Sequence, residues 1–238
     1  MAGSTLLEIS VESTAAAVAA ERGGAHRIEL CADLRLGGLT PSEESMLSVR
    51  KSVRLPIFAM IRPRAGDFVY SDLERLRMKM DIDIAQRAGM DGIVLGLVGR
   101  DPVTGHHRID VGRTQVMVWH AKPLPVTFHR AFDIVDDLEA GMKDLMRTGA
   151  ARVLTSGGAD TALAGIENLA TLVKAGKERV IVVPGGGVNA GNVAQIAKRS
   201  GAREIHSGLG SVLAYGQQDY ASFENEVRKM VNQLAERE

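Results

Sequence analysis

Two short apolar runs carry an acidic residue two positions before a hydroxyl or thiol residue, as Glu8-x-Ser10 and Glu29-x-Cys31. If these runs form neighbouring parallel strands, the shared offset predicts that Glu8 lies beside Glu29 at about one strand spacing, roughly 5 Å. The same offset places Ser10 beside Cys31. Two carboxylates that close do not both ionise cheaply, so either one is protonated or a cation lies between them. Arg62 is the expected cation. The alternative is a Glu–Arg ion cluster with a structural role.

Two histidines, His129 and His206, end further apolar runs, where an imidazole can act as a general base or a metal ligand. With Glu29 they would form a two-histidine, one-carboxylate set for a transition metal. A metal-free structural role is the alternative for both. As catalytic residues, we expect Glu29 and His129 to transfer protons. We expect Glu8 and His206 to tune them, and Arg62 to hold an oxyanion.

Glycine-rich stretches follow the last three apolar runs, RVLTS, VIVVP and EIHS. Backbone N–H groups in such loops can converge on an anion such as phosphate. The alternative is a set of tight turns in which glycine supplies a positive φ. The loop residues predicted to bind substrate are Gly185, Gly186, Gly187, Gly208 and Gly210, with Ser156 and Gly157 extending the same rim.

The loop after the third run, RPRAGDFVY, begins at Arg62 and combines two guanidinium groups, a carboxylate and two aromatic rings. Loops of this kind shape ligand specificity. We expect Arg64 and Asp67 in this loop to clamp an anionic or sugar-like ligand.

Eight apolar runs must position these residues, beginning at Leu6, Arg27, Ile57, Gly92, Pro125, Arg152, Val180 and Glu204. Stretches with helical spacing lie between them, so each repeat has the length of one β/α unit. This predicts a TIM (β/α)8 barrel, a single α/β domain over residues 1–238. The alternative, a doubly wound open sheet, would have continuously apolar strands. Here polar residues recur at period two, which is typical of a polar barrel interior. Barrel active sites lie at the C-terminal strand ends.

Composition narrows the function classes. The 238 residues include 29 basic and 29 acidic side chains, so no overall field attracts nucleic acid. No apolar run is long enough for a membrane helix, and the chain start lacks the pattern of a secretion signal. One cysteine cannot form an internal disulfide. We therefore expect a cytoplasmic protein whose partners are a small molecule or a metal ion, with no nucleic acid and no membrane.

Several blocks together resemble the CutC family, which is named for copper homeostasis. They are RIELCADLRLGGLTPS, MIRPRAGDFVYSD, LPVTFHRAFD, RVLTSGG, VPGGGV and EIHS. The resemblance implies a cytoplasmic TIM barrel that forms homo-oligomers, as a dimer or tetramer. It also implies a link to copper tolerance, with Cu(I) binding in some members. The matching positions include two further substrate-binding candidates, Arg130 and Asp133.

One departure from the family pattern concerns copper. Many members have cysteine where this chain has Ser10, so Cys31 is the one metal-ligand candidate left from the cysteine pair. The cofactor expectation is thus Cu(I), bound weakly, or another transition metal. The sequence predicts a CutC-like copper homeostasis protein with a polar site at the barrel mouth. The alternative is an enzyme that does acid/base chemistry on a small anionic or phosphorylated sugar-like substrate, with copper binding incidental.

Overall fold

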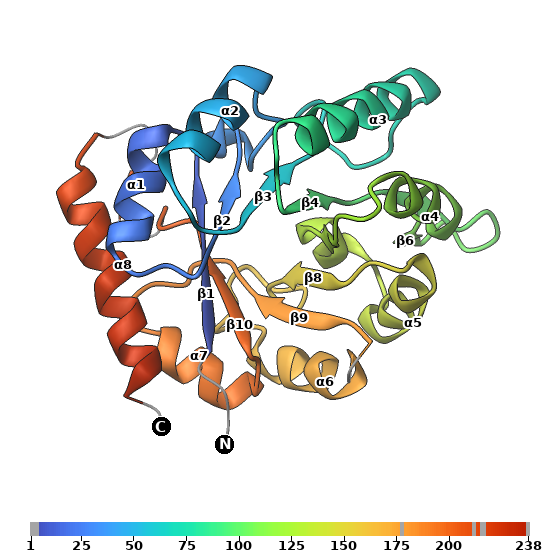
Figure 1. Cartoon of the computed structure of the whole chain (residues 1–238). Helices are drawn as coiled ribbons and strands as arrows, with labels where there is room; N and C mark the ends of the chain where they lie inside the picture. Colours follow the sequence, from blue (N-terminus) through green and yellow to red (C-terminus); the bar gives the residue numbers. More distant parts are fainter. Residues whose placement is uncertain (1–4, 177–178, 211–212, 215–217, 237–238) are drawn as a thin grey trace.

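Eight parallel strands form a nearly closed barrel at the centre of the protein (Figure 1). The structure is a computed structural model that describes residues 5–176, 179–210, 213–214 and 218–236. The strands pair in the order β10-β1-β2-β3-β4-β7-β8-β9. Their bounds are β1 (Leu6–Val11), β2 (Arg27–Leu30), β3 (Ile57–Met60), β4 (Gly92–Leu95), β7 (Val126–Phe128), β8 (Arg152–Thr155), β9 (Ile181–Pro184) and β10 (Glu204–Ser207). The predicted TIM barrel is confirmed, and the open-sheet alternative is wrong.

Helices follow the strands and surround the barrel (Figure 1). Most begin at a side-chain cap, such as Ser13, Ser71 or Asp137, and two end at a glycine with positive φ, Gly149 and Gly201. Their bounds are α1 (Thr14–Arg22), α2 (Glu43–Ser52), α3 (Asp72–Arg87), α4 (Val111–His120), α5 (Leu138–Thr148), α6 (Ile166–Gly176), α7 (Val193–Ser200) and α8 (Tyr220–Ala235), with the short 3-10 helices η1 (Leu34–Leu36) and η2 (Arg130–Ile134). No helix of the described residues is long and apolar enough to cross a membrane.

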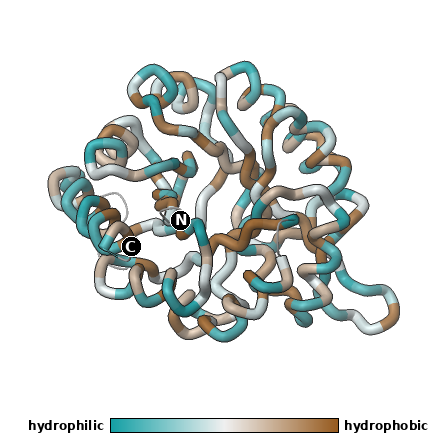
Figure 2. The backbone as a smooth tube through the Cα atoms, turned by 60° about the horizontal axis from the view of Figure 1, so that its bottom comes forward, coloured by the Kyte–Doolittle hydropathy of each residue, from teal (hydrophilic) through white to brown (hydrophobic). Residues whose placement is uncertain are grey.

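The strands alternate between an apolar outer face and a more polar inner face. In β1, Leu7, Ile9 and Val11 join the hydrophobic core between the sheet and the helices. The residues between them, Glu8 and Ser10, are buried on the opposite face, inside the barrel. Figure 2 shows hydrophobic residues concentrated along the strands, whereas hydrophilic residues are frequent on the surrounding helices.

The register between β1 and β2 differs from the prediction. Glu8 pairs with Arg27, and Ser10 pairs with Glu29, so neither Glu8–Glu29 nor Ser10–Cys31 is a direct pair. The strands of a barrel are staggered so that the sheet can close, and here the stagger shifts the pairing by two residues. Because side chains alternate at period two, all these residues remain on the inner face.

A small antiparallel hairpin was not predicted. It consists of β5 (Val98–Arg100) and β6 (His107–Ile109), which lie between β4 and α4. Its connecting loop contains His106, in the Gly-flanked segment that sequence patterns left without a strand.

Candidate functional site

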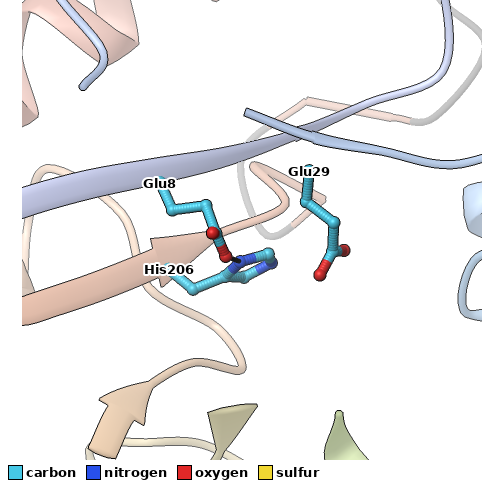
Figure 3. Close-up of side chains that lie close together, drawn as sticks. All are labelled: Glu8, Glu29 and His206. Carbon is cyan, nitrogen blue, oxygen red and sulfur yellow. Dashed lines mark hydrogen bonds and ion pairs between the residues drawn. The ribbon is translucent and has the colours of Figure 1, made fainter. Parts of the chain in front are cut away.

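A buried hydrogen-bonded chain crosses the barrel interior from β1 to β2 by way of β10. The Nδ1 atom of His206 lies 2.7 Å from an oxygen of Glu8, and its Nε2 atom lies 2.8 Å from the Ser10 hydroxyl. Ser10 in turn donates to Oε1 of Glu29 at 3.1 Å. Figure 3 shows the His206 ring between the two carboxylates. The two acids predicted to interact are therefore linked through His206 and Ser10.

The charges at the Glu8 end of this chain are strongly stabilised. Burial alone would raise the pKa of Glu8, but the charge of Arg27 and the hydrogen bond from His206 outweigh it and lower the pKa to about 2. Burial alone would lower the pKa of His206, but the charge of Glu29 and the bond to Glu8 raise it overall. Glu8 is thus a fixed carboxylate, and His206 favours its protonated form.

Glu29, at the other end, is in a different environment. Burial and then the charge of Glu8 raise its pKa, against the opposing effects of His206, Cys31 and Ser10. Its Oε1 accepts bonds from Ser10 and from the Cys31 thiol, the latter at 3.4 Å, whereas its buried Oε2 has no partner among the described residues. A carboxyl group with a raised pKa and one free oxygen is suited to exchange a proton with a ligand.

Arg27, rather than Arg62, is the cation that contacts Glu8. Its guanidinium contacts Glu8 and Glu204 and lies 4.8 Å above the Phe58 ring. Arg152 joins the same buried network through Glu204 at 3.1 Å. Sequence reasoning missed Arg27, although its spacing from Glu29 by two residues was a signal that both share the inner face.

Arg62 instead shapes the rim of the barrel. Its guanidinium donates to the backbone carbonyls of Leu36, Gly38 and Gly66, and it lies 4.9 Å from the centre of the Phe68 ring. The prediction that Arg62 separates the two carboxylates is therefore wrong. Its terminal groups are committed to the loops after β2 and β3, which gives it a positioning role at the rim.

His129 is held in a defined tautomer. Its Nδ1 accepts the backbone N–H of Ala131 at 3.1 Å and so caps η2. Burial and the charge of Arg62 lower its pKa to about 3, so the ring is neutral at pH 7. Because Nδ1 is an acceptor, the proton of the neutral ring is on Nε2, which is buried without a partner among the described residues. His129 therefore presents a free N–H donor.

These residues line one cavity of about 450 Å³ at the C-terminal ends of the strands, which we call the mouth. Glu29, Arg62, His129 and His206 all line it, as predicted for one mouth. Glu8, which was predicted with them, is not among the lining residues and is hydrogen-bonded to His206. Further predicted residues on its wall are Arg130, Gly186, Gly187, Gly208 and Gly210. The wall also contains residues that were not predicted as site residues, although Ser10 and the Phe68 ring had been noted in their sequence runs; these are Ser10, Leu34, Leu36, Gly37, Met60, Phe68, Leu154, Val188 and Leu209.

The two last glycine loops form one side of the mouth. Gly186 and Gly187 have φ values of 106° and 69°, which glycine adopts without strain. Among the hydrogen bonds of the described residues, the N–H groups of Gly186, Gly187 and Gly208 reach no protein acceptor. Gly185 is required for packing instead, because an added Cβ would lie 2.5 Å from Leu154.

The remaining candidates are engaged with their own loops. Arg64 pairs with Asp67 and Glu74, so both clamp candidates lie outside the mouth cavity. Asp133 accepts bonds from Thr155 and from Ser156 and Gly158 N–H groups, and Arg130 donates to Asp133 and to Ser156 Oγ at 2.9 Å. Asp133, Ser156 and Gly157 therefore fix the loop after β8, and of this group only Arg130 reaches the mouth wall among the described residues.

A metal site can be tested against the donor atoms present. Atoms of Glu8, Glu29 and His206 lie within 4.8 Å of one another, whereas His129 is not in this group among the described residues. Both oxygens of Glu8 are already bound by Arg27 and His206. Burial and the charge of Glu29 raise the Cys31 thiol pKa well above its usual value, so no thiolate is available at neutral pH. With Ser10 as the neighbouring group, these donors do not fit Cu(I).

The fold and the mouth define the class: a TIM-barrel protein with a polar ligand cavity at the C-terminal strand ends. The sequence model of the CutC family matches residues 5–211. Copper homeostasis protein cutC homolog from Homo sapiens is 47% identical over 201 residues, which cover 84% of this chain and 72% of the relative. A CutC family protein from Xylella fastidiosa (strain Temecula1) is 45% identical over 208 residues, covering 87% and 76%. The chain therefore belongs to the CutC family, and the human relative is named for copper homeostasis.

Solved structures agree with this assignment. The crystal structure of a CutC protein from Streptococcus agalactiae has a TM-score of 0.78 and 29% identity, covering 85% of this chain and 98% of that one. Thiamine phosphate pyrophosphorylase from Pyrococcus furiosus has a TM-score of 0.63 at 19% identity, covering 97% and 96%. The second likeness reflects the barrel fold alone.

Proposed function

We propose that the mouth binds a small anionic ligand and carries out acid/base chemistry on it. One observation carries the proposal: Glu29 Oε2 and His129 Nε2 are deeply buried polar atoms without partners among the described residues, and their side chains line the same cavity. Arg62 Nε is a third such atom on the cavity wall. A buried polar atom without a partner costs about 1 to 3 kcal/mol. A ligand that accepts a bond from His129 and faces Glu29 removes both costs.

The two groups have complementary roles. Glu29, as a carboxylate, removes a proton from a ligand carbon next to a carbonyl group. The C–H electron pair forms a carbon–carbon double bond, and the carbonyl electron pair moves onto oxygen. The neutral His129 N–H donates a hydrogen bond to that oxygen as its charge develops. The proton on Glu29 exchanges with solvent, and return of a proton from Glu29 to the same carbon, with the enolate electrons reforming the carbonyl group, completes a hydrogen exchange.

The glycine loops support an anionic ligand. Within the part of the chain that the structure describes, the N–H groups of Gly186, Gly187 and Gly208 have no acceptor and so can bind an oxyanion, and the Arg130 side chain lies next to Gly186. Loops after the last two strands of a TIM barrel often bind phosphate. The ligand class supported best is therefore a phosphorylated hydroxy-carbonyl compound small enough for about 450 Å³.

Exchange of substrate hydrogen with solvent tests this function. A panel of small phosphorylated aldoses and ketoses would be incubated with the protein in D₂O and followed by NMR. We expect deuterium incorporation next to the carbonyl of at least one compound, and a loss of about 10² to 10⁴ in rate for Glu29→Gln. Ser200→Ala is the control, because this buried hydroxyl donates to the Ile196 carbonyl and accepts from the Ala202 N–H at the end of α7, and Ser200 is not among the residues that line the mouth. No exchange with any compound, or equal exchange by Glu29→Gln, would refute the proposal.

We also infer a cytoplasmic location and self-association, both from the family resemblance. Neighbouring helices α3 and α4 carry exposed apolar side chains, including Leu73 at 76% and Trp119 at 72% exposure. Such a face supports contact with a second copy of the chain. Light scattering of Trp119→Glu against the wild type tests this, because a dimer held by this face would dissociate.

A further inference from the structure

Among the residues that the structure describes, Ser10 is the one hydrogen-bonded link between His206, at the charged end of the buried chain, and Glu29. Its hydroxyl lies 2.8 Å from His206 Nε2 and 3.1 Å from Glu29 Oε1. Only 3% of Ser10 is exposed, so water competes little for these bonds. Among the described residues no direct hydrogen bond joins His206 to Glu29.

The hydrogens of this chain can be arranged in one direction. A protonated His206 donates through Nδ1 to Glu8 and through Nε2 to Ser10. Ser10 then accepts from His206 and donates its own proton to Glu29. At each bond a donor faces an acceptor, so the hydrogen-bonded chain is continuous from Glu8 to Glu29.

The surroundings decide which way a proton can move. Arg27, itself bound to Glu204, contacts Glu8 from β2, and Arg152 on β8 binds Glu204. Arg27 and His206 keep Glu8 ionised, with its pKa at about 2. On the other side, Glu29 faces Cys31, whose thiol stays protonated. Glu29 is thus the acid in the chain that can accept a proton.

We propose, on the basis of the proposed function above, that Ser10 is a positioning residue that relays protons between His206 and Glu29. In the relay step the His206 Nε2–H bond breaks as that proton bonds to Ser10 Oγ. The original Ser10 O–H bond breaks as its proton bonds to Glu29 Oε1. His206 becomes neutral, Glu29 becomes a carboxylic acid, and Ser10 is unchanged overall. The reverse step returns Glu29 to its basic form.

Titration of the ligand-free protein tests the relay. The His206 ring nitrogens and the Glu29 side-chain carboxyl carbon would be followed by NMR against pH in wild type, Ser10→Thr and Ser10→Ala. Loss of the hydroxyl leaves the His206 N–H without an acceptor and Glu29 without a donor. In Ser10→Ala we expect the His206 pKa to fall and the Glu29 pKa to rise, each by about one unit.

Two variants separate a relay from a packing role. Ser10→Thr keeps a hydroxyl, and we expect both titrations to stay close to those of the wild type. Ser200→Ala removes a buried hydroxyl in α7 that is not part of the hydrogen-bonded chain, and it should change neither the His206 pKa nor the Glu29 pKa. The relay is refuted if Ser10→Ala leaves both pKa values unchanged, or if Ser10→Thr shifts them as Ser10→Ala does.

This outcome is independent of the ligand. If the titrations behave as expected but no compound exchanges hydrogen in D₂O, the relay stands and the proposed function fails. If exchange occurs while Ser10→Ala titrates like the wild type, the function stands and the relay is wrong.

Discussion

Ser10 and Cys31 both contact one oxygen, Oε1 of Glu29, although their strand positions are not paired. A hydroxyl is a poor ligand for Cu(I), which prefers thiolates. We therefore predict weak Cu(I) binding by the native chain. We predict much tighter binding by Ser10→Cys, because two sulfurs would then lie on either side of Glu29 Oε1. Competition with a chelator at fixed pH under reducing conditions measures both. Tight native binding that Cys31→Ser leaves unchanged would contradict this prediction.

Also at the residue scale, the position of His129 could be predicted from the sequence, whereas its tautomer could not. Its place at the end of a strand was predicted from the PVTFHR run. Its tautomer was not, because that depends on the Ala131 N–H in a 3-10 helix that only the folded loop forms. The structure therefore favours a hydrogen-bond donor over the general base expected for His129.

At the scale of the element, Gly96, directly after β4, leaves room for the His129 ring. A Cβ on Gly96 would lie 2.5 Å from the Nδ1 atom of His129. Gly96→Ala should push the ring off its cap, with a loss of about 1 to 3 kcal/mol in the free energy of unfolding and weaker phosphate binding. Thermal denaturation and phosphate titration measure the two effects. Gly112→Ala is the matched control, because nothing lies within 4 Å of its added Cβ. Equal behaviour of both variants would contradict the prediction.

Strands β1, β2 and β10 are joined by a buried ion network whose stability depends on pH. The pKa of Glu8 is about 2 in the folded protein against 4.5 for a free side chain. A depressed pKa stabilises the fold above pH 4.5, and this stabilisation is lost as pH falls from 4.5 to 2. Denaturant unfolding across this range should show a steeper loss in the wild type than in Glu8→Gln. The exposed Glu167→Gln should retain the steep loss, and identical slopes in all three would refute this origin of acid sensitivity.

The elements also show why the strands were predictable and their register was not. All eight predicted apolar runs contain a barrel strand, because each run and its following helix form a local unit. The pairing of Glu8 with Arg27 depends instead on the stagger that closes the whole barrel. No pair of strands encodes that stagger alone, so Arg27 was overlooked as the partner of Glu8.

At the scale of the whole molecule, the barrel brings residues from distant segments to one cavity. Glu29, His129, His206 and the glycine loops come from β2, β7, β10 and the ends of β9 and β10. Gathering at the C-terminal strand ends was predictable from the fold class. The sequence alone did not show which of these residues face the cavity and which stabilise its loops. Asp133 was assigned to the second group only from its hydrogen bonds in the folded protein.

A high-resolution crystal structure of the protein soaked in inorganic phosphate tests the ligand site most directly. We predict a phosphate ion at the mouth, bound by the N–H groups of Gly186 and Gly187 and within reach of the Arg130 side chain. Its nearest oxygen, or a water bound to it, should accept from His129 Nε2. A mouth free of phosphate at high concentration, or an ion bound only at surface side chains elsewhere, would contradict the anionic ligand on which the account depends.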